Sequence, residues 1–405
     1  MPTTDSNSSE TSPTRPSHLR QVNARGLLQL LRTHSPCSKA DLVRLSGLSA
    51  PTVSAAIAHL ESMNLVESLG EGESSGGRPP ELIRFNAQHG YVAAADIGGT
   101  RLRMMLADLN GKAVAQWSTQ FTEKQKTPKA VCAIIHEGLR EMCRQAETTV
   151  QKILHITAGA PGITDVDHGV VRSAPNLVGW DDVPLRAMLE RETGISTIAE
   201  NDTNLAAVGE HWQGSARDVD NFVFIAMGTG VGAGIFLHGR LYHGAEWSAG
   251  EIGYLGVTGV LRESPQMRQT GQLERIIGGI GIEEQWGRRL KRDKRQNDPA
   301  LTKLRAPQIF DLAQEGDPLA IHVLTDTAQI LADAIGTISL LFNPRLIVLG
   351  GGVGAHECLC RATEKFVAKN EFAHPRLRSS SLGTQAQLFG AISLSLTAVD
   401  GTLIS

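Results

Sequence analysis

Three short runs of the chain combine glycine with residue types that handle phosphate groups. The first, residues 92–100 (VAAADIGGT), is an apolar stretch that ends in Asp96 and the turn Gly98-Gly99-Thr100. A glycine turn after a strand lets backbone N–H groups and a hydroxyl approach phosphate, while the acid can hold Mg²⁺ through water. The run therefore predicts a phosphate-binding turn.

Two further glycine turns follow apolar segments later in the chain. One such match is a weak signal, because ordinary glycine hairpins remain its alternative. Three in one chain are typical of two similar α/β halves with a nucleotide between them. The residues expected at the phosphates are Gly228, Thr229 and Gly230 in the second turn and Gly350 and Gly351 in the third.

An acidic strand end, residues 198–204 (IAENDTN), leads into a helix expected over residues 205–212. Asp202 is placed to take a proton from a hydroxyl that attacks a γ-phosphate. Capping of that helix is the alternative role, because aspartate caps helices routinely. Polar loops at residues 175–177 and 248–253 suit a polyhydroxy ligand, which is held by many directional hydrogen bonds.

The segment before residue 65 has the pattern of a helix-turn-helix. A helical apolar stripe over residues 22–32 is followed by a short helix that Ser38 caps and that stops at Gly47. The next helix begins at its N-cap Ser49, with Pro51 in its first turn. Two short helices around a glycine turn form this motif. We expect Thr52, Ser54 and Ala55 to face the major groove of DNA and Ser49 to lie near a phosphate.

A hairpin predicted over residues 65–85 completes a winged helix, and its tip carries Arg78 next to two prolines. Such an arm can enter a narrow A·T-rich minor groove, whose negative potential attracts arginine. Residues 15–60 contain six basic residues against Asp41 alone, a local balance of 6 − 1 = +5 in a chain of net charge −3. This basic segment fits a contact with phosphates, and a solvated helix face is the alternative.

Bulk properties limit the remaining choices. A chain of 405 residues predicts two or three domains. Its five scattered cysteines form no disulfide framework, which favours a reducing cytoplasm. No apolar run reaches membrane-spanning length, and the Ser-, Thr- and Pro-rich N-terminus is typical of a disordered leader rather than a signal peptide.

The order of the motifs resembles the ROK family (repressors, open reading frames, kinases). From about residue 22 the chain resembles the family's winged-helix repressor branch, which includes N-acetylglucosamine and xylose repressors. The motifs that carry the resemblance are DIGGT at 96–100, APNL at 174–177, END at 200–202, GTGVG at 228–232 and AGEIG at 249–253.

The resemblance implies an α/β protein: an N-terminal winged helix-turn-helix followed by an actin/hexokinase-like, two-lobed sugar-kinase fold. The expected parts are a leader (1–18), a DNA-binding domain (19–88), a first lobe (89–200) joined by a helix at 386–402, and a second lobe (201–385). It implies that Asn176, Asn201, Asp202 and Glu251 bind sugar hydroxyls, with Asp202 as the base. The first two glycine turns would line ATP phosphates, and family members form dimers or tetramers.

Two departures from the family pattern affect the site. Tyr254 stands where the family has a zinc-binding histidine, and residues 267–274 contain no cysteine, so zinc is predicted to be absent. Glu274 matches a family glutamate that contacts sugar. Tyr254 can replace the histidine's hydrogen bond to a hydroxyl, or it can be a packed core tyrosine.

These features predict a cytoplasmic, sugar-responsive transcriptional regulator, more specifically a repressor. A sugar or sugar phosphate closes the kinase-like body and releases double-stranded operator DNA from a homodimer or homotetramer. No cofactor is required, ATP with Mg²⁺ is an optional ligand, and no membrane is involved. We expect weak or absent kinase activity, since loss of the zinc site leaves the loop that supports Glu274 without its clamp. The alternative is a glucokinase-like, ATP-dependent sugar kinase with an accessory DNA-binding domain.

Overall fold

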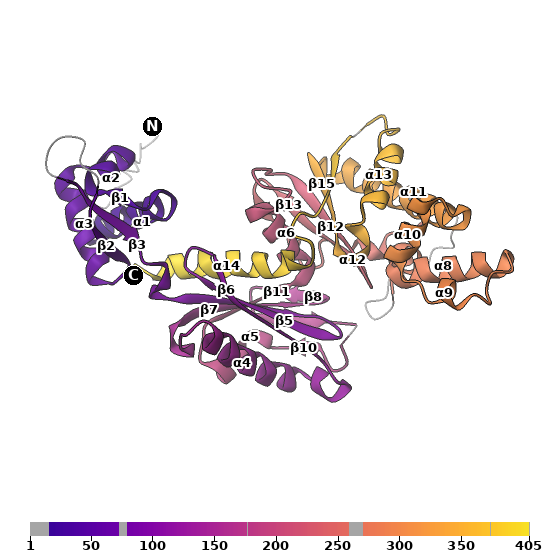
Figure 1. The fold of residues 1–405 in the computed structure, drawn as a ribbon, viewed down its shortest axis with the longest axis horizontal. Coiled ribbons are helices and arrows are strands. Elements are labelled where there is room, and N and C mark those ends of the chain that lie inside the picture. The colour runs from indigo at the N-terminus through magenta and orange to yellow at the C-terminus, as the bar shows by residue number, and fades with distance from the viewer. Residues whose placement is uncertain (1–15, 73–78, 176, 259–269, 373, 405) are drawn as a thin grey trace, which may run out of the picture. The chain divides into compact units, whose positions relative to one another are not determined.

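The computed structural model describes residues 16–72, 79–175, 177–258, 270–372 and 374–404 (Figure 1). The chain divides into two compact units. The first comprises Met1–Tyr91, Asp108–Lys112 and Thr397–Ser405, and the second comprises Val92–Ala107 and Ala113–Leu396. No helix of the described ranges is both long enough and apolar enough to cross a membrane.

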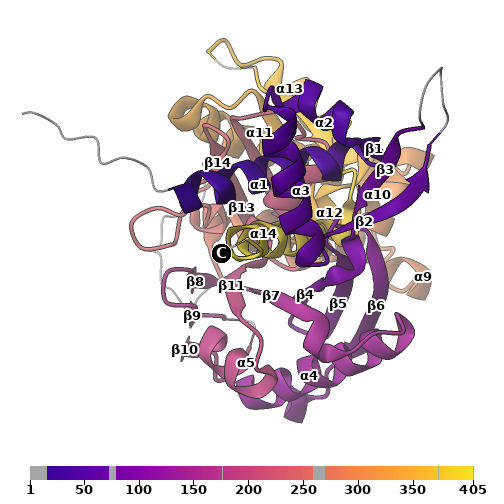
Figure 2. The same ribbon diagram turned by 90° about the vertical axis from the view of Figure 1, so that its left-hand side faces the viewer.

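The described residues of the first unit include the helices α1, α2 and α3 and a three-stranded antiparallel sheet in the order β1-β3-β2 (Figure 2). Its core contains the apolar stripe of the first helix, including Leu27 and Leu31, and Ile57 and Leu60 from the third. The elements are α1 (Pro16–His34), β1 (Cys37–Ser38), α2 (Lys39–Ser46), α3 (Ala50–Ser62), β2 (Val66–Glu71), β3 (Glu81–Phe85) and η1 (Ala87–His89).

Local side-chain chemistry sets the ends of α2 and α3, as predicted. Ser38 and Asp41 form a reciprocal capping box at the start of α2, and Gly47 ends that helix in the left-handed conformation at φ 68°. The side chain of Ser49 accepts a hydrogen bond from the backbone of Thr52 at the start of α3. The predicted helix-turn-helix and the antiparallel pair β2–β3 are confirmed, while the wing tip at residues 73–78 lies outside the described residues.

Two residues of the basic segment bind the end of the chain. The Nη1 of Arg32 lies 2.6 Å from Oδ2 of Asp400, and its guanidinium lies 4.8 Å from the ring centre of Phe85. Arg25 donates to the carbonyl oxygen of Gly401 at 3.1 Å. The Arg32 side chain is only 15% exposed. The expectation that this whole segment forms a basic face is therefore wrong for Arg32, because its side chain pairs and packs within the unit.

The second unit begins with a five-stranded sheet in the order β11-β7-β4-β5-β6 and a small antiparallel sheet β10-β9-β8. Strand β4 is buried along its whole length, which explains its nearly continuous apolar sequence. The elements of this part are β4 (Tyr91–Ile97), β5 (Arg101–Asp108), β6 (Ala113–Gln120), η2 (Glu123–Lys126), α4 (Pro128–Gln145), η3 (Val150–Lys152), β7 (Ile153–Ala160), β8 (Ile163–Asp165), β9 (Val170–Ser173), β10 (Asp181–Val183), α5 (Leu185–Thr193) and β11 (Thr197–Asn201).

A second five-stranded sheet has the order β14-β13-β12-β15-β16. Its buried face packs with α8, α10 and α11 in a large apolar core. The elements are α6 (Asp202–Gln213), β12 (Phe222–Met227), β13 (Val231–Leu237), β14 (Arg240–Leu241), η4 (Ile252–Tyr254), α7 (Gln272–Ile277), α8 (Gly279–Arg292), α9 (Pro299–Thr302), α10 (Ala306–Glu315), α11 (Pro318–Phe342), β15 (Leu346–Gly350), α12 (Gly351–Gly354), α13 (Glu357–Val367), β16 (Arg376–Ser379), η5 (Gly383–Gln385) and α14 (Ala386–Thr402).

Candidate functional site

Asp202 is the first residue of α6 and directly follows β11. The N-cap of α6 is its neighbour Asn201, whose Oδ1 accepts from the backbone of Asn204 at 2.9 Å. The alternative that Asp202 caps this helix is therefore wrong. The Oδ1 of Asp202 accepts from the backbone N–H of Thr203 at 2.7 Å, which fixes one carboxylate oxygen.

Four carboxyl groups from separate elements influence one another at this position. Burial is the main cause that raises the pKa of Asp202 to about 7, and the charges of Asp96 and Glu251 add to this shift. Burial, followed by the charge of Glu274, raises the pKa of Glu251 to about 6. A carboxyl group whose pKa lies near neutrality suits general acid–base chemistry. The structure thus brings together acids that the sequence placed on β4, on α6, on the loop before η4 and on α7.

Glu274 supports the second glycine turn. Its Oε2 accepts from the backbone N–H of Val231 at 2.8 Å, and a Cβ atom on Gly230 would lie 2.8 Å from that same oxygen. The backbone N–H of Gly279, where α8 begins, donates to the carbonyl oxygen of Gly228 at 2.8 Å. Glu274 and the start of α8 therefore hold the turn that was predicted to face phosphate.

The second and third glycine turns are adjacent. Strands β12 and β15 pair in parallel, so both turns leave the same edge of the sheet. Gly351 has φ 80°, and a Cβ atom there would lie 2.4 Å from the carbonyl oxygen of Met227. Because only glycine fits this close approach, its place in the sequence has a steric cause. The structure therefore brings these two turns together.

The first glycine turn has a partner that the sequence reading missed. At the end of β4, the Oδ2 of Asp96 accepts from Nε of Arg103 at 2.8 Å and from its Nη2 at 2.5 Å. Arg103 lies on β5, where it separates the buried residues Leu102 and Met104. An arginine inside an otherwise buried strand was the available signal, since such a charge requires a partner.

The expected sugar-binding residues make the following contacts. Asn201 donates through Nδ2 to the carbonyl oxygen of Gly162 at 2.7 Å, in addition to its capping role. Tyr254 is half-buried, and burial raises its pKa, with the charges of Glu251 and Glu274 adding to the shift. Asn176 lies outside the described residues.

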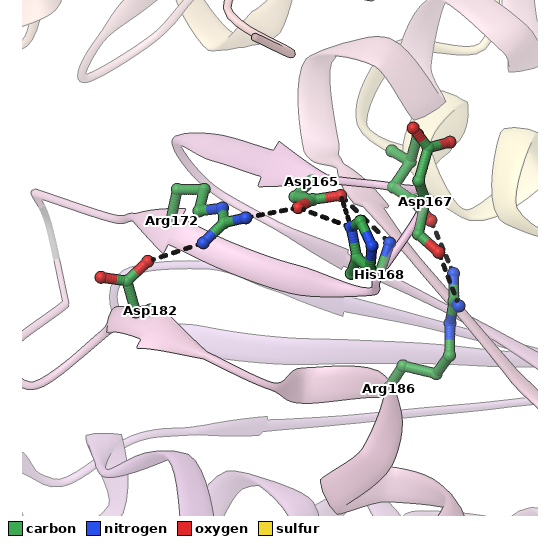
Figure 3. A network of polar contacts seen from close by, with 7 residues as sticks. Asp165, Asp167, His168, Arg172, Asp182 and Arg186 are labelled. Atoms are coloured by element: carbon green, nitrogen blue, oxygen red, sulfur yellow. Dashed lines mark hydrogen bonds and ion pairs between the residues drawn. The ribbon is translucent and has the colours of Figure 1, made fainter.

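A buried carboxylate, Asp165, stabilises the small antiparallel sheet of β8, β9 and β10 (Figure 3). Asp165 has no exposed side-chain surface and accepts from His168 Nδ1 and, at 2.6 Å, from Nη2 of Arg172. Arg172 also binds Asp182 at 3.2 Å and lies 5.8 Å from the ring centre of Trp247. Arg172 thus links β8, β9 and β10 with the loop that precedes Glu251, a connection that the sequence did not indicate.

The candidate DNA interface centres on α3. Ser54 and Ala55 are exposed, as predicted, and Thr52 is half-buried with its hydroxyl 2.8 Å from that of Ser49. Over the first two turns of α3, the exposed positions carry small or uncharged side chains. Arg78 lies outside the described residues. Neighbouring cations are paired with acids. The Nζ of Lys39 lies 3.8 Å from Oε1 of Glu61 and 3.8 Å from Oε2 of Glu81. The Nε of Arg84 lies 2.5 Å from Oε1 of Glu67.

The residues around Tyr254 do not fit a structural zinc ion. A tyrosine stands at the imidazole position, and thiolates are missing from residues 267–274. Over the ranges that the structure describes, no group of three or more histidine, cysteine, aspartate or glutamate side chains could hold a metal.

Two α/β halves with three glycine turns and an acidic centre define a sugar-kinase-like body, here on a chain with a winged helix. Residues 92–398 match the model of the ROK family, and residues 11–72 match that of the DprA winged helix domain. The chain belongs to the ROK family. The predicted fold, a winged helix-turn-helix followed by the ROK sugar-kinase-like fold, is confirmed.

The relatives of this chain include proteins named as repressors and proteins named as glucokinases. It is 28% identical over 394 residues to a putative xylose repressor of Caldicellulosiruptor sp. (strain Rt8B.4), covering 93% of this chain and 96% of the relative. It is 31% identical over 312 residues to a glucokinase of Halalkalibacterium halodurans, covering 74% and 93%. A crystal structure of a ROK family transcriptional regulator, a homologue of the E. coli MLC protein, has 25% identity and a TM-score of 0.77, with coverage of 96% and 98%.

Proposed function

We propose that this protein is a sugar-responsive transcriptional regulator that represses its target genes. The observation that carries the proposal is the presence, in one chain, of a capped helix-turn-helix with a wing and of a ROK body whose acids converge on one site. The similarity to a putative xylose repressor covers 93% of this chain, and the similarity to a ROK family transcriptional regulator covers 96%. A kinase without regulatory function does not require the first unit.

We propose that some residues of the winged helix recognise bases and that others fix its position on the DNA. Thr52, Ser54 and Ala55 on α3 read base edges in the major groove, Ser49 lies near a phosphate, and Arg78 on the wing enters the minor groove. Because the outward face of α3 has exposed hydroxyl and methyl groups, hydroxyl bonds and methyl contacts supply the discrimination. The protein acts on double-stranded operator DNA in the cytoplasm, as a homodimer or homotetramer.

The ligand is proposed to be a sugar or a sugar phosphate, held by Asn176, Asn201, Asp202, Glu251, Tyr254 and Glu274. The glycine turns are proposed to receive phosphate groups, whether from the ligand or from a nucleotide. Ligand binding closes the two lobes of the body on each other. The first lobe comprises residues 89–200 with the helix at 386–402, and the second comprises residues 201–385. This closure disfavours the DNA-bound arrangement of the winged helices at residues 19–88. A ligand shifts such an equilibrium only by its difference in affinity for the two states.

A sugar kinase is the second candidate function. The pKa of Asp202, raised to about 7, favours it, because a base near neutrality can accept the proton of an attacking hydroxyl. The pairing of Asp96 with Arg103 opposes it. The similarity to a glucokinase over 74% of the chain is a further observation in favour of this second candidate function.

The test has two steps and uses the full-length protein. A thermal-shift screen of sugars and sugar phosphates, with and without ATP, identifies ligands, since a ligand that binds the folded state raises its melting temperature. Duplexes selected from a random pool then serve in gel-shift assays with each ligand. We expect the stabilising sugar to lower affinity for the selected duplex by at least about tenfold, or roughly 1.4 kcal/mol. Unchanged DNA affinity with every stabilising sugar would contradict the proposal, and ADP release with sugar would support the kinase.

A further inference from the structure

We propose that Arg103 takes the place of a magnesium ion at Asp96, so that the body binds its ligand without requiring a Mg²⁺-nucleotide complex. The inference rests on the proposed function only in treating the acidic centre as a ligand site. It concerns Asp96, the carboxylate at the end of β4 that precedes the glycine turn at residues 98–100, and it assigns a role to a side chain on β5 that no sequence motif covers.

The contact between the two side chains is close and sheltered. Nε of Arg103 lies 2.8 Å and Nη2 lies 2.5 Å from the same oxygen, Oδ2 of Asp96. The side chains are 17% and 8% exposed, so solvent screens their interaction much less than that of a surface ion pair. Burial raises the pKa of Asp96, and Arg103 is the first group that opposes this shift.

Arg103 is held in place from other directions. Its Nη1 donates to the carbonyl oxygen of Thr384 in η5, and Nη2 lies 3.4 Å from Oε1 of Gln387 in the first turn of α14. Four of the five N–H groups of the guanidinium therefore have acceptors in the protein. A side chain committed in this way is a fixed counter-ion of Asp96, and it does not serve as a free anchor for an incoming phosphate.

A fixed cation at Asp96 conflicts with magnesium binding. Magnesium bound in such sites relies on one or two protein carboxylates together with phosphate oxygens, and it keeps several waters. At this position Oδ2 of Asp96 already accepts two N–H groups from Arg103, and two cations in a sheltered site repel each other. Loss of the metal position leaves sugar binding at Asp202 and Glu251 intact but removes the charge stabilisation that phosphoryl transfer requires.

The experiment measures how Mg²⁺ changes the affinity of the full-length protein for the ATP analogue AMPPNP, by titration calorimetry with and without the metal. The variant is Arg103→Met, which keeps the aliphatic length and removes the charge. Arg140→Met, which removes an exposed arginine on α4, is the control. We expect Mg²⁺ to change affinity by less than about twofold in the wild type and in the control, and to strengthen it at least about tenfold in Arg103→Met.

Three results would overturn the proposal. One is a wild type whose AMPPNP affinity already rises about tenfold with Mg²⁺, a measurement that needs no variant. Another is an Arg103→Met protein that loses AMPPNP binding with and without metal, which would make the arginine a phosphate anchor. The third is a folded Arg103→Met protein without any response to Mg²⁺. Arg103→Gln, which retains a hydrogen-bond donor, replaces the methionine variant if that variant fails to fold. Sugar stabilisation and DNA binding, measured in parallel, test the proposed function separately.

Discussion

The imidazole Nε2 of His243 lies 2.7 Å from Oε2 of Glu200, a carboxylate at the end of β11 that is almost fully buried. The other oxygen of Glu200 accepts from the side chain of Asn204 at 3.0 Å and from the backbone of Asn201 at 2.8 Å. This pair therefore joins the loop that leads to Glu251 with the strand end that carries the acidic motif.

The first prediction concerns the pH dependence of this pair. The hydrogen bond that the imidazole donates to Glu200 is the main cause that raises the pKa of His243 above 6.5, with the charges of Glu200 and Asp167 adding to it. A raised folded-state pKa gives stability that is complete below the ordinary value and is lost as pH rises through the folded value. We expect the melting temperature of the wild type to exceed that of His243→Gln most at about pH 6 and least at about pH 8. His322→Gln, at an exposed site on α11, is the control, and a pH-independent difference would contradict the charge-based explanation.

Asp202→Asn should stabilise the ligand-free protein above neutral pH. Because burial raises the folded-state pKa of Asp202 from 3.8 to about 7, ionising the group costs folding free energy as pH rises between these values. The gain in melting temperature should therefore be large at about pH 8 and vanish toward about pH 4. Asp333→Asn, exposed on α11, should show no such trend.

The same Asp202 variant separates chemistry from structure. Any sugar-dependent release of ADP should disappear, since asparagine cannot accept the proton of a hydroxyl. Gel-shift affinity of the ligand-free variant for selected DNA should match the wild type. A parallel loss of DNA affinity would assign the residue a structural role.

Base reading by α3 predicts sequence-selective losses. Thr52→Ala and Ser54→Ala should each reduce the preference for the selected duplex over random DNA by roughly 1–3 kcal/mol. Ser62→Ala is the matched control, because this residue is exposed on the same helix at its far end. Equal losses on selected and random DNA would instead assign Thr52 and Ser54 to phosphate contacts.

The wing predicts a contact that depends on base composition. Arg78→Ala should weaken binding to duplexes with A·T-rich flanks more than to those with G·C-rich flanks, because the narrow groove of A·T tracts attracts arginine. Arg84→Ala, which removes an arginine already paired with Glu67 on the same hairpin, is the control. Unchanged gel-shift affinity of Arg78→Ala on both kinds of flank would remove the wing from the interface.

Metal content tests the departure from the family pattern. With Tyr254 at the imidazole position and no cysteine in residues 267–274, purified protein should contain less than about 0.1 equivalent of zinc per chain. Elemental analysis of protein prepared without chelator measures this directly. About one equivalent that survives dialysis would show that other ligands hold the metal.

Local signals in the sequence were sufficient to predict several elements of the fold. The caps at Ser38 and Ser49, the buried strand before the first glycine turn and the glycine turns themselves were predictable, because hydrogen bonds and steric limits within a few residues determine them. The motif order also indicated the family, which the match over residues 92–398 confirms.

Tertiary structure alone decided which side chains meet and what charge they carry. Arg32 and Asp400 are separated by 368 positions in the chain, and Arg103 reaches Thr384 over 281. The sequence could not assign Asn201 rather than Asp202 as the helix cap, nor place the pKa of Asp202 near 7. Burial and long-range pairing determine these properties, and both arise only when segments distant in the chain pack together.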